Sequence, residues 1–164
     1  MRARQILGDT RPAPILLGWG LGGVFANLPA LLIIGGLGAA LFRFLPEPSH
    51  PAVDQLIQSR DPMTIARIFV AAVIFAPILE EVIFRGLLMP AIARVTGSVG
   101  WGVALSSFLF AAIHPQGIAA WLGLATVGAM CALITVQTRS LIPAMVLHAL
   151  HNGALLVVNL VLFA

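Results

Sequence analysis

Residues 76–90 read APILEEVIFRGLLMP and place two carboxylates and one guanidinium within six residues of an otherwise apolar helical stretch. A single charge at the centre of a bilayer is unfavourable by roughly 2.5–3.5 kcal/mol on insertion scales. Glu80, Glu81 and Arg85 therefore need partners or a chemical task. The simplest interpretation is one buried ion-pair network that ties helices together, but ionisable groups inside a membrane are by default functional candidates.

The sequence around this stretch has the composition of a membrane protein. Of its 164 residues, 60% are hydrophobic and only 9% are charged, whereas an average soluble domain has about 25% charged residues. From Val95 onward, Arg139 is the only formally charged residue, so this part of the chain cannot cover itself with a water-facing surface. The composition predicts an all-α, multi-pass transmembrane helical bundle, because the alternating segments of a membrane β-barrel are absent.

The apolar segments predict about five spans, since about 20 residues are enough for a helix to cross a bilayer. The expected spans are residues 15–45, 63–93, 101–114, 118–136 and 141–163. The proline-rich stretch 46–62 is the clearly aqueous part, and its Val53, Leu56 and Ile57 suggest a short amphipathic surface helix.

Three regions follow from this division of the chain. Residues 1–14 form a basic tail, residues 15–62 contain the first span with its aqueous loop, and residues 63–164 form a membrane core. The basic tail is followed by further membrane segments, so we expect the first span to be retained and not cleaved as a signal peptide.

The basic residues of the chain indicate a lipid bilayer and no nucleic acid as its partner. All nine are arginines, and most of them flank spans, so membrane topology accounts for the sequence pI near 11. With five crossings, one group of arginines falls on a single side of the membrane, which predicts a cytoplasmic N-terminus and an external C-terminus. This group comprises Arg2, Arg4, Arg11, Arg94 and Arg139.

Helix geometry separates the roles of the three charges in the central stretch. Glu81 and Arg85 are four residues apart and about 40° apart around the helix axis, so we expect them to pair. Glu80 points roughly 140° away from Arg85 on the same wheel. A carboxylate that lacks a close cation is available as a general base.

A few other polar side chains of the apolar segments are candidates to meet that carboxylate. His114 closes the third span, and Phe110 lies one turn earlier on the same face. His148 and Asn152 share a face of the last span, whereas His151 lies at its margin, where an interhelical contact is the simpler role. One carboxylate, two imidazoles and one amide are enough to activate a water molecule and to stabilise a tetrahedral oxyanion.

The sequence does not support three other protease chemistries. It contains no HExxH motif, which excludes a zinc-helix metalloprotease of that type. No serine stands in a GxSG-like context, as a rhomboid-like serine protease would need, and no aspartate lies in an apolar span, which excludes an aspartyl dyad.

Three motifs follow one another on successive predicted helices. Residues 80–85 fit EExxxR, residues 110–114 fit FxxxH and residues 148–152 fit HxxxN. With the adjoining FRGLL and TRSLIPA segments, the sequence resembles the CPBP family of intramembrane proteases, which includes the type II CAAX prenyl proteases and the bacterial Abi proteins. The similarity runs from about residue 68 to residue 158, so it assigns the catalytic site to the membrane core.

The resemblance implies an integral, multi-pass, metalloprotease-like endopeptidase of the bacterial cell (inner) membrane, for which CAAX processing of prenylated proteins is the model. Glu80 would activate the hydrolytic water, Asn152 would stabilise the oxyanion and Phe110 would shape the pocket. His114 and His148 would hold either that water by hydrogen bonds or a divalent metal such as zinc, and both alternatives stay open. The catalytic residues implied by the resemblance are Glu80, Glu81, Arg85, His114, His148 and Asn152.

Two other functions use the same polar residues. One is a non-catalytic membrane protein that serves bacteriocin immunity or partner binding. The other is a small transporter component in which Glu80 and the histidines relay protons or bind metal. A peptide or protein substrate, prenylated or not, is expected for the protease function only.

Overall fold

The computed structural model describes residues 11–45, 50–59 and 61–163, and the regular structure in these residues is helical throughout. The elements in chain order are α1 (Ala13–Ala30), η2 (Leu31–Gly35), α2 (Gly36–Leu41), α3 (Pro51–Gln58), α4 (Pro62–Val70), η3 (Ala71–Phe75), α5 (Ala76–Glu81), η4 (Val82–Leu88), α6 (Met89–Thr96), α7 (Val99–Ala112), α8 (Ile118–Thr138) and α9 (Ile142–Phe163), where η marks π-helical segments. Most of the predicted tail and part of the aqueous stretch lie outside the described residues.

Four of the described helices are long and apolar enough to cross a membrane, which confirms the predicted multi-pass helical bundle. These four are Ala13–Leu41, Pro62–Thr96, Ile118–Thr138 and Ile142–Phe163. The third expected span is a shorter helix, α7, with 14 residues. At 1.5 Å per residue it is about 21 Å long, which is less than the roughly 30 Å of a hydrocarbon core. The three proposed regions of the chain stay predictions.

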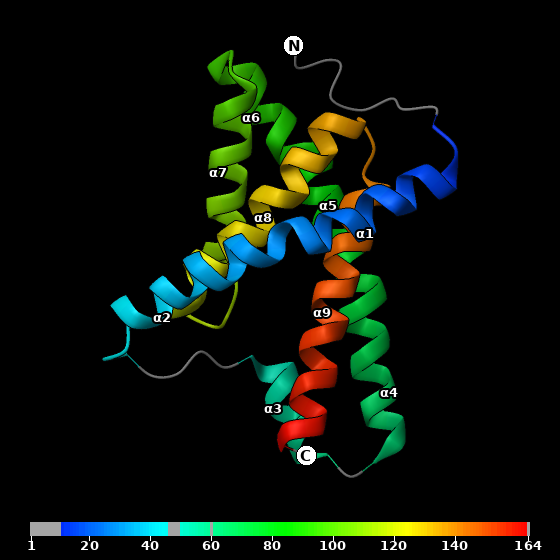
Figure 1. The fold of residues 1–164 in the computed structure, drawn as a ribbon, viewed down its shortest axis with the longest axis vertical. Helices are drawn as coiled ribbons and strands as arrows, with labels where there is room; N and C mark the ends of the chain where they lie inside the picture. Colours follow the sequence, from blue (N-terminus) through cyan, green and yellow to red (C-terminus); the bar gives the residue numbers. More distant parts are fainter. Residues whose placement is uncertain (1–10, 46–49, 60, 164) are drawn as a thin grey trace.

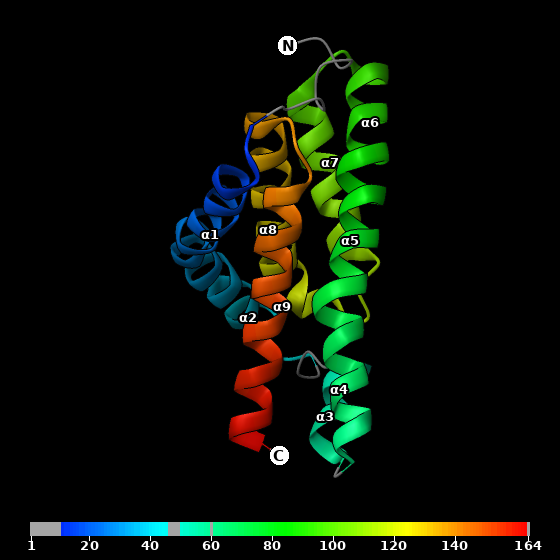
Figure 2. The same ribbon diagram turned by 90° about the vertical axis from the view of Figure 1, so that its right-hand side faces the viewer.

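The helices form a layered bundle around α8 and α9. Figures 1 and 2 show α1 and α2 on one side of this pair and the column α4–α6 on the other. Glycines allow α1 to approach its neighbours closely: a Cβ on Gly20 would lie 2.6 Å from Val146 Cβ, and one on Gly23 would lie 2.8 Å from Leu147 Cδ1. Small residues of this kind are the usual means of close helix packing in membranes.

The outer surface of the bundle is apolar. Large hydrophobic side chains point outward from several spans, such as Phe25 at 73% exposure, Ile33 at 71% and Val161 at 75%. A soluble protein would not expose such a surface, but lipid tails cover it without an energetic penalty.

The predicted amphipathic helix in the aqueous stretch is present as α3. Its Leu56 is fully buried and packs with Ile68 of α4 and Leu156 of α9. This contact fixes the segment between the first two spans against the ends of α4 and α9 (Figure 1).

The long second span contains a backbone irregularity with a clear cause. At the end of η3, the N–H of Ala76 donates to the carbonyl of Ala71, five residues earlier. In the same pattern, the carbonyl of Ala72 would accept from residue 77, but Pro77 has no N–H. The helix therefore presents an open carbonyl at Ala72, in the turns that lead to the two glutamates.

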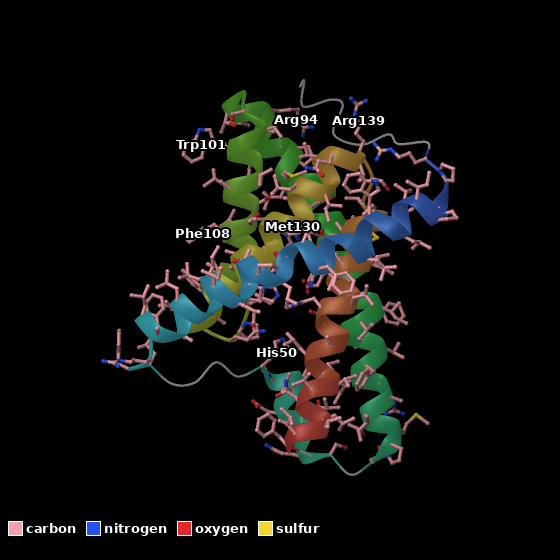
Figure 3. All side chains as sticks on the ribbon, viewed as in Figure 1. His50, Arg94, Trp101, Phe108, Met130 and Arg139 are labelled. Atoms are coloured by element: carbon pink, nitrogen blue, oxygen red, sulfur yellow. The ribbon has the colours of Figure 1, made fainter. Side chains whose placement is uncertain are left out.

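Arginines gather at one end of the molecule. Figure 3 shows Arg94 and Arg139 at the same end, and Arg11 Nη2 donates to the carbonyl of Gln137, 3.3 Å away. The predicted grouping is thus present for these three arginines. The assignment of this end to the cytoplasm stays a prediction.

Candidate active site

Glu81 and Arg85 form a fully buried ion pair. Arg85 Nη1 donates to Glu81 Oε1 at 3.0 Å, and neither side chain is exposed. Arg85 Nη2 donates to the carbonyl of Gly128 in α8 at 2.7 Å. A Cβ on Gly128 would lie only 3.1 Å from Nη2, so the missing side chain makes room for the guanidinium. The pairing expected from their spacing is present, and it also joins η4 to α8.

The hydrogen bonds of two histidines determine which ring nitrogen carries the proton. His148 Nδ1 lies 2.9 Å from Glu81 Oε1, and His114 Nδ1 lies 2.6 Å from the carbonyl of Phe110. A carboxylate and a carbonyl only accept hydrogen bonds, so both Nδ1 atoms must donate. In each neutral ring, Nε2 is then an acceptor.

Three hydrogen-bond acceptors converge at the centre of the site. Glu80 Oε2 lies 3.8 Å from His114 Nε2 and 3.7 Å from His148 Nε2. Oε2 is buried and makes no hydrogen bond within the described part of the chain. A cluster of acceptors without a donor between them is unfavourable unless a donor enters, and a water molecule supplies two donor hydrogens. The structure therefore brings together the carboxylate and the two imidazoles in the way that the sequence predicts.

Phe110 forms a wall behind both imidazoles. Its ring is 1% exposed, and its centroid lies 4.4 Å from that of His114 and 5.5 Å from that of His148. The Arg85 guanidinium carbon lies 4.6 Å from the same centroid, a distance typical of a cation–π contact. One aromatic ring thus restrains both histidines, in agreement with the pocket position predicted for it.

Asn152 bonds to the irregular backbone of the second span. Its Nδ2 donates to the carbonyl of Ala72 at 3.0 Å, so it satisfies the acceptor that Pro77 leaves open. The amide carries two N–H groups, and the side chain also lines the cavity described below. One N–H remains for a group inside that cavity, and the predicted role at the oxyanion stays a prediction.

One cavity of about 610 Å³ contains Glu80, His114, His148 and Asn152 in its lining. Its volume is in the range of small-molecule binding sites. The lining also includes polar residues to which the sequence analysis assigned no place in the site, namely His50, Gln55, Thr64, Arg67, Gln116 and His151. His151 makes no hydrogen bond within the described residues, so the interhelical contact expected for it is not seen.

The spacing of the side chains in this site bears on whether they could hold a metal ion. The described residues contain no group of three or more His, Cys, Asp or Glu side chains placed to hold one. The separations of 3.7 and 3.8 Å from Glu80 Oε2 to the two Nε2 atoms are wider than the roughly 3.4 Å between ligands of a tetrahedral zinc ion with bonds of about 2.0–2.1 Å. In this arrangement the residues do not fit a zinc ion, and the metal predicted on His114 and His148 stays a prediction.

Comparison with known proteins identifies the family to which the chain belongs. Residues 62–154 match a family model described as "Type II CAAX prenyl endopeptidase Rce1-like", and this range includes all three motifs. Searches of curated proteins and of solved structures each gave no match. The family match covers more than half of the 164 residues. The chain therefore belongs to the Rce1-like family of type II CAAX prenyl endopeptidases.

Proposed function

We propose that this protein is an intramembrane endopeptidase in which Glu80 activates a water molecule. The observation that carries the proposal is the convergence of Glu80 Oε2, His114 Nε2 and His148 Nε2, at 3.7 and 3.8 Å from the carboxylate oxygen. Because all three atoms are acceptors, a water molecule would donate one hydrogen to Glu80 Oε2 and the other to one of the two imidazole Nε2 atoms, which leaves its lone pairs directed toward a substrate.

The reaction follows from this orientation of the water. As the water oxygen attacks the scissile carbonyl carbon, Glu80 takes one proton, and a tetrahedral oxyanion forms. The free N–H of Asn152 would donate to that oxyanion. When the C–N bond breaks, Glu80 returns the proton to the leaving amine, so the carboxylate is restored and one water is consumed per bond.

Glu81 and Arg85 act on the histidine and not on the substrate. Glu81 fixes the His148 ring through Nδ1, and Arg85 pairs with Glu81 in a position where neither side chain is exposed. The positioning of the imidazole therefore depends on a pair that the cavity lining does not include.

The cavity suits a peptide that carries a lipid. The polar residues of its lining are joined by apolar ones from several helices, such as Ile68, Leu124, Val127 and Leu156. We therefore propose a prenylated protein with a C-terminal CAAX sequence as the substrate class. From the family resemblance we propose a bacterial inner membrane as the location.

Cleavage of a fluorogenic farnesylated CAAX peptide by the protein in proteoliposomes tests this function. We expect Glu80→Gln to lower kcat by about 10²- to 10⁴-fold, the usual contribution of a general base, and to leave the melting temperature nearly unchanged. Asp61→Asn is the matched control, because Asp61 is exposed, lies outside the cavity and caps α4 in a way that Asn can also perform. Equal activity of Glu80→Gln and the control would assign the cluster to partner binding.

The same assay tests the metal. We expect cleavage to persist after treatment with 1,10-phenanthroline, because the three acceptors are arranged to hold water by hydrogen bonds. A loss of activity that Zn²⁺ restores would instead place a metal ion on His114 and His148.

A further inference from the structure

His50 lines the same cavity as Glu80 and His114, although it lies in neither the three motifs nor the matched residues 62–154. It immediately precedes α3, in the segment between the first two spans. Figure 3 shows it near α9 and away from the end that carries Arg94, and its side chain is partly buried. A residue of the connecting segment thus reaches the cavity that the membrane helices enclose.

The proton of the His50 ring is placed by a backbone hydrogen bond. The N–H of Ala52 donates to His50 Nδ1 at 3.1 Å, so His50 caps the first turn of α3. A nitrogen that accepts cannot carry the proton of a neutral ring, so the proton is on Nε2. This is the opposite of His114 and His148, whose Nε2 atoms accept.

The surroundings of His50 keep the ring neutral. Burial lowers its pKa, and His114 lowers it further, while the weaker effects of Glu80 and Asp54 oppose both. The ring is also held in place, because Leu56 anchors α3 between Ile68 and Leu156. His50 is therefore a fixed neutral donor near a cluster of acceptors.

We propose that His50 Nε2–H donates a hydrogen bond to a backbone carbonyl of the peptide substrate, which makes His50 a substrate-binding residue of this cavity. A peptide bond that approaches Glu80, His114 and His148 meets acceptors only, so its own carbonyls need donors from elsewhere in the lining. The inference rests on the proposed function, since it names a residue that binds the same substrate.

Two substitutions of His50 separate its proposed role as a donor to the substrate from its role as the N-cap of α3. His50→Gln places an N–H close to the position of Nε2 and gives up the cap acceptor. His50→Asn places an oxygen close to the position of Nδ1, which keeps the cap, but no N–H reaches the position of Nε2. Each His50 substitution is made in the Glu80→Gln variant, which is expected to bind the farnesylated CAAX peptide without cleaving it. The parent for comparison is the Glu80→Gln variant with His50 intact.

The dissociation constant of that peptide and the melting temperature are measured in detergent micelles. We expect His50→Asn to weaken binding by about 3- to 10-fold, as for one neutral hydrogen bond, and His50→Gln to stay within about 2-fold of the parent. Weakening in His50→Gln, with binding kept in His50→Asn, would reduce His50 to a helix cap and overturn the inference. Equal binding in both variants, whether kept or lost, would overturn it as well.

Binding and cleavage fail separately in this design. Suppose that the Glu80→Gln parent binds the peptide with the expected dependence on His50, but the protein with Glu80 intact does not cleave it. The His50 inference then holds and the proposed hydrolysis is wrong. If the peptide does not bind the parent protein at all, the His50 inference is wrong, whatever cleavage assays show.

Discussion

Glu81 serves two partners through one oxygen atom. Its Oε1 accepts from Arg85 at 3.0 Å and from His148 at 2.9 Å, while its Oε2 has no hydrogen-bond partner within the described residues. The neighbouring Glu80 makes neither of these hydrogen bonds, although its Oε2 lies 3.7 Å from His148 Nε2, and it lines the cavity. Two adjacent glutamates therefore differ in function because one binds the protein and the other is left for a reactant.

This difference predicts that the two glutamates differ in their effect on stability. Glu81→Gln removes the countercharge of a buried arginine, and breaking a buried pair in this way costs about 3–5 kcal/mol. Glu80→Gln is the matched control, because Glu80 does not pair with Arg85. We expect it to lower the free energy of unfolding by much less. The free energy of unfolding in mixed micelles with increasing SDS measures both, and similar losses would show that Glu80 is also a structural anion.

At the level of the element, Pro77 and Asn152 form a matched pair across two helices. The proline removes the N–H that the Ala72 carbonyl would receive in η3, and the asparagine on α9 supplies a replacement at 3.0 Å. The contact joins the two spans one helix segment away from Glu80. Asn152 is thus a helix-positioning residue as well as the predicted oxyanion donor.

A double-mutant cycle separates these two roles. Asn152→Leu leaves the Ala72 carbonyl unsatisfied, which costs about 1–3 kcal/mol of unfolding free energy. In a Pro77→Ala background the new N–H satisfies that carbonyl, so we expect the cost of Asn152→Leu to fall by at least about 1 kcal/mol. Cleavage should remain lower by about 10²- to 10³-fold in the double variant, because a lost oxyanion donor is not replaced.

Pro29→Ala is the control for this cycle, since Pro29 lies inside the first span and far in sequence from η3. The stability cost of Asn152→Leu should be unchanged in that background. A cost that is the same in the parent chain and in the Pro77→Ala background would mean that the asparagine does not act through the Ala72 carbonyl.

For the whole molecule, the arginines predict the orientation in the membrane. Arg11, Arg94 and Arg139 lie at one end, so this end is expected to face the cytoplasm. Thr96→Cys at that end and Gln58→Cys on α3 at the other, both exposed, report the orientation in a Cys131→Ala background. In intact bacterial cells an impermeant maleimide should label the residue-58 cysteine and reach the residue-96 cysteine only after permeabilisation. If the cysteine at position 96 were labelled in intact cells and the one at position 58 only after permeabilisation, the end with the arginines would face outward and the predicted orientation would be wrong.

The sequence predicted the parts of the site that depend on helical periodicity. Residues that are four apart share a helix face, and this rule predicted the Glu81–Arg85 pair and the contact between Phe110 and His114. The composition predicted a multi-pass helical bundle, and the order of the three motifs along the chain predicted the family. These inferences need only local geometry and the energetic cost of polar groups in lipid.

The sequence did not predict the parts that depend on tertiary packing. His50 reaches the cavity because Leu56 packs between two distant helices, and nothing in its local sequence reports that contact. The partner of Asn152 depends on a π-helical register, which moves the open carbonyl by one residue relative to an α-helix. Pro77 is visible in the sequence, but which carbonyl it leaves without a donor can be seen only from the backbone hydrogen bonds of the structure.

The buried charges also bear on where along a chain this site would cut. Glu81 and Arg85 offset each other's charge, which leaves the Glu80 carboxylate as the negative group among the converging side chains, and Arg67 also lines the cavity. A free carboxylate adjacent to the scissile bond would be repelled by that charge at short range, and a weakly polar interior screens the repulsion poorly. Trimming of single residues from a chain end is therefore disfavoured, and release of a short multi-residue fragment, whose own terminus stays several residues away from Glu80, is favoured.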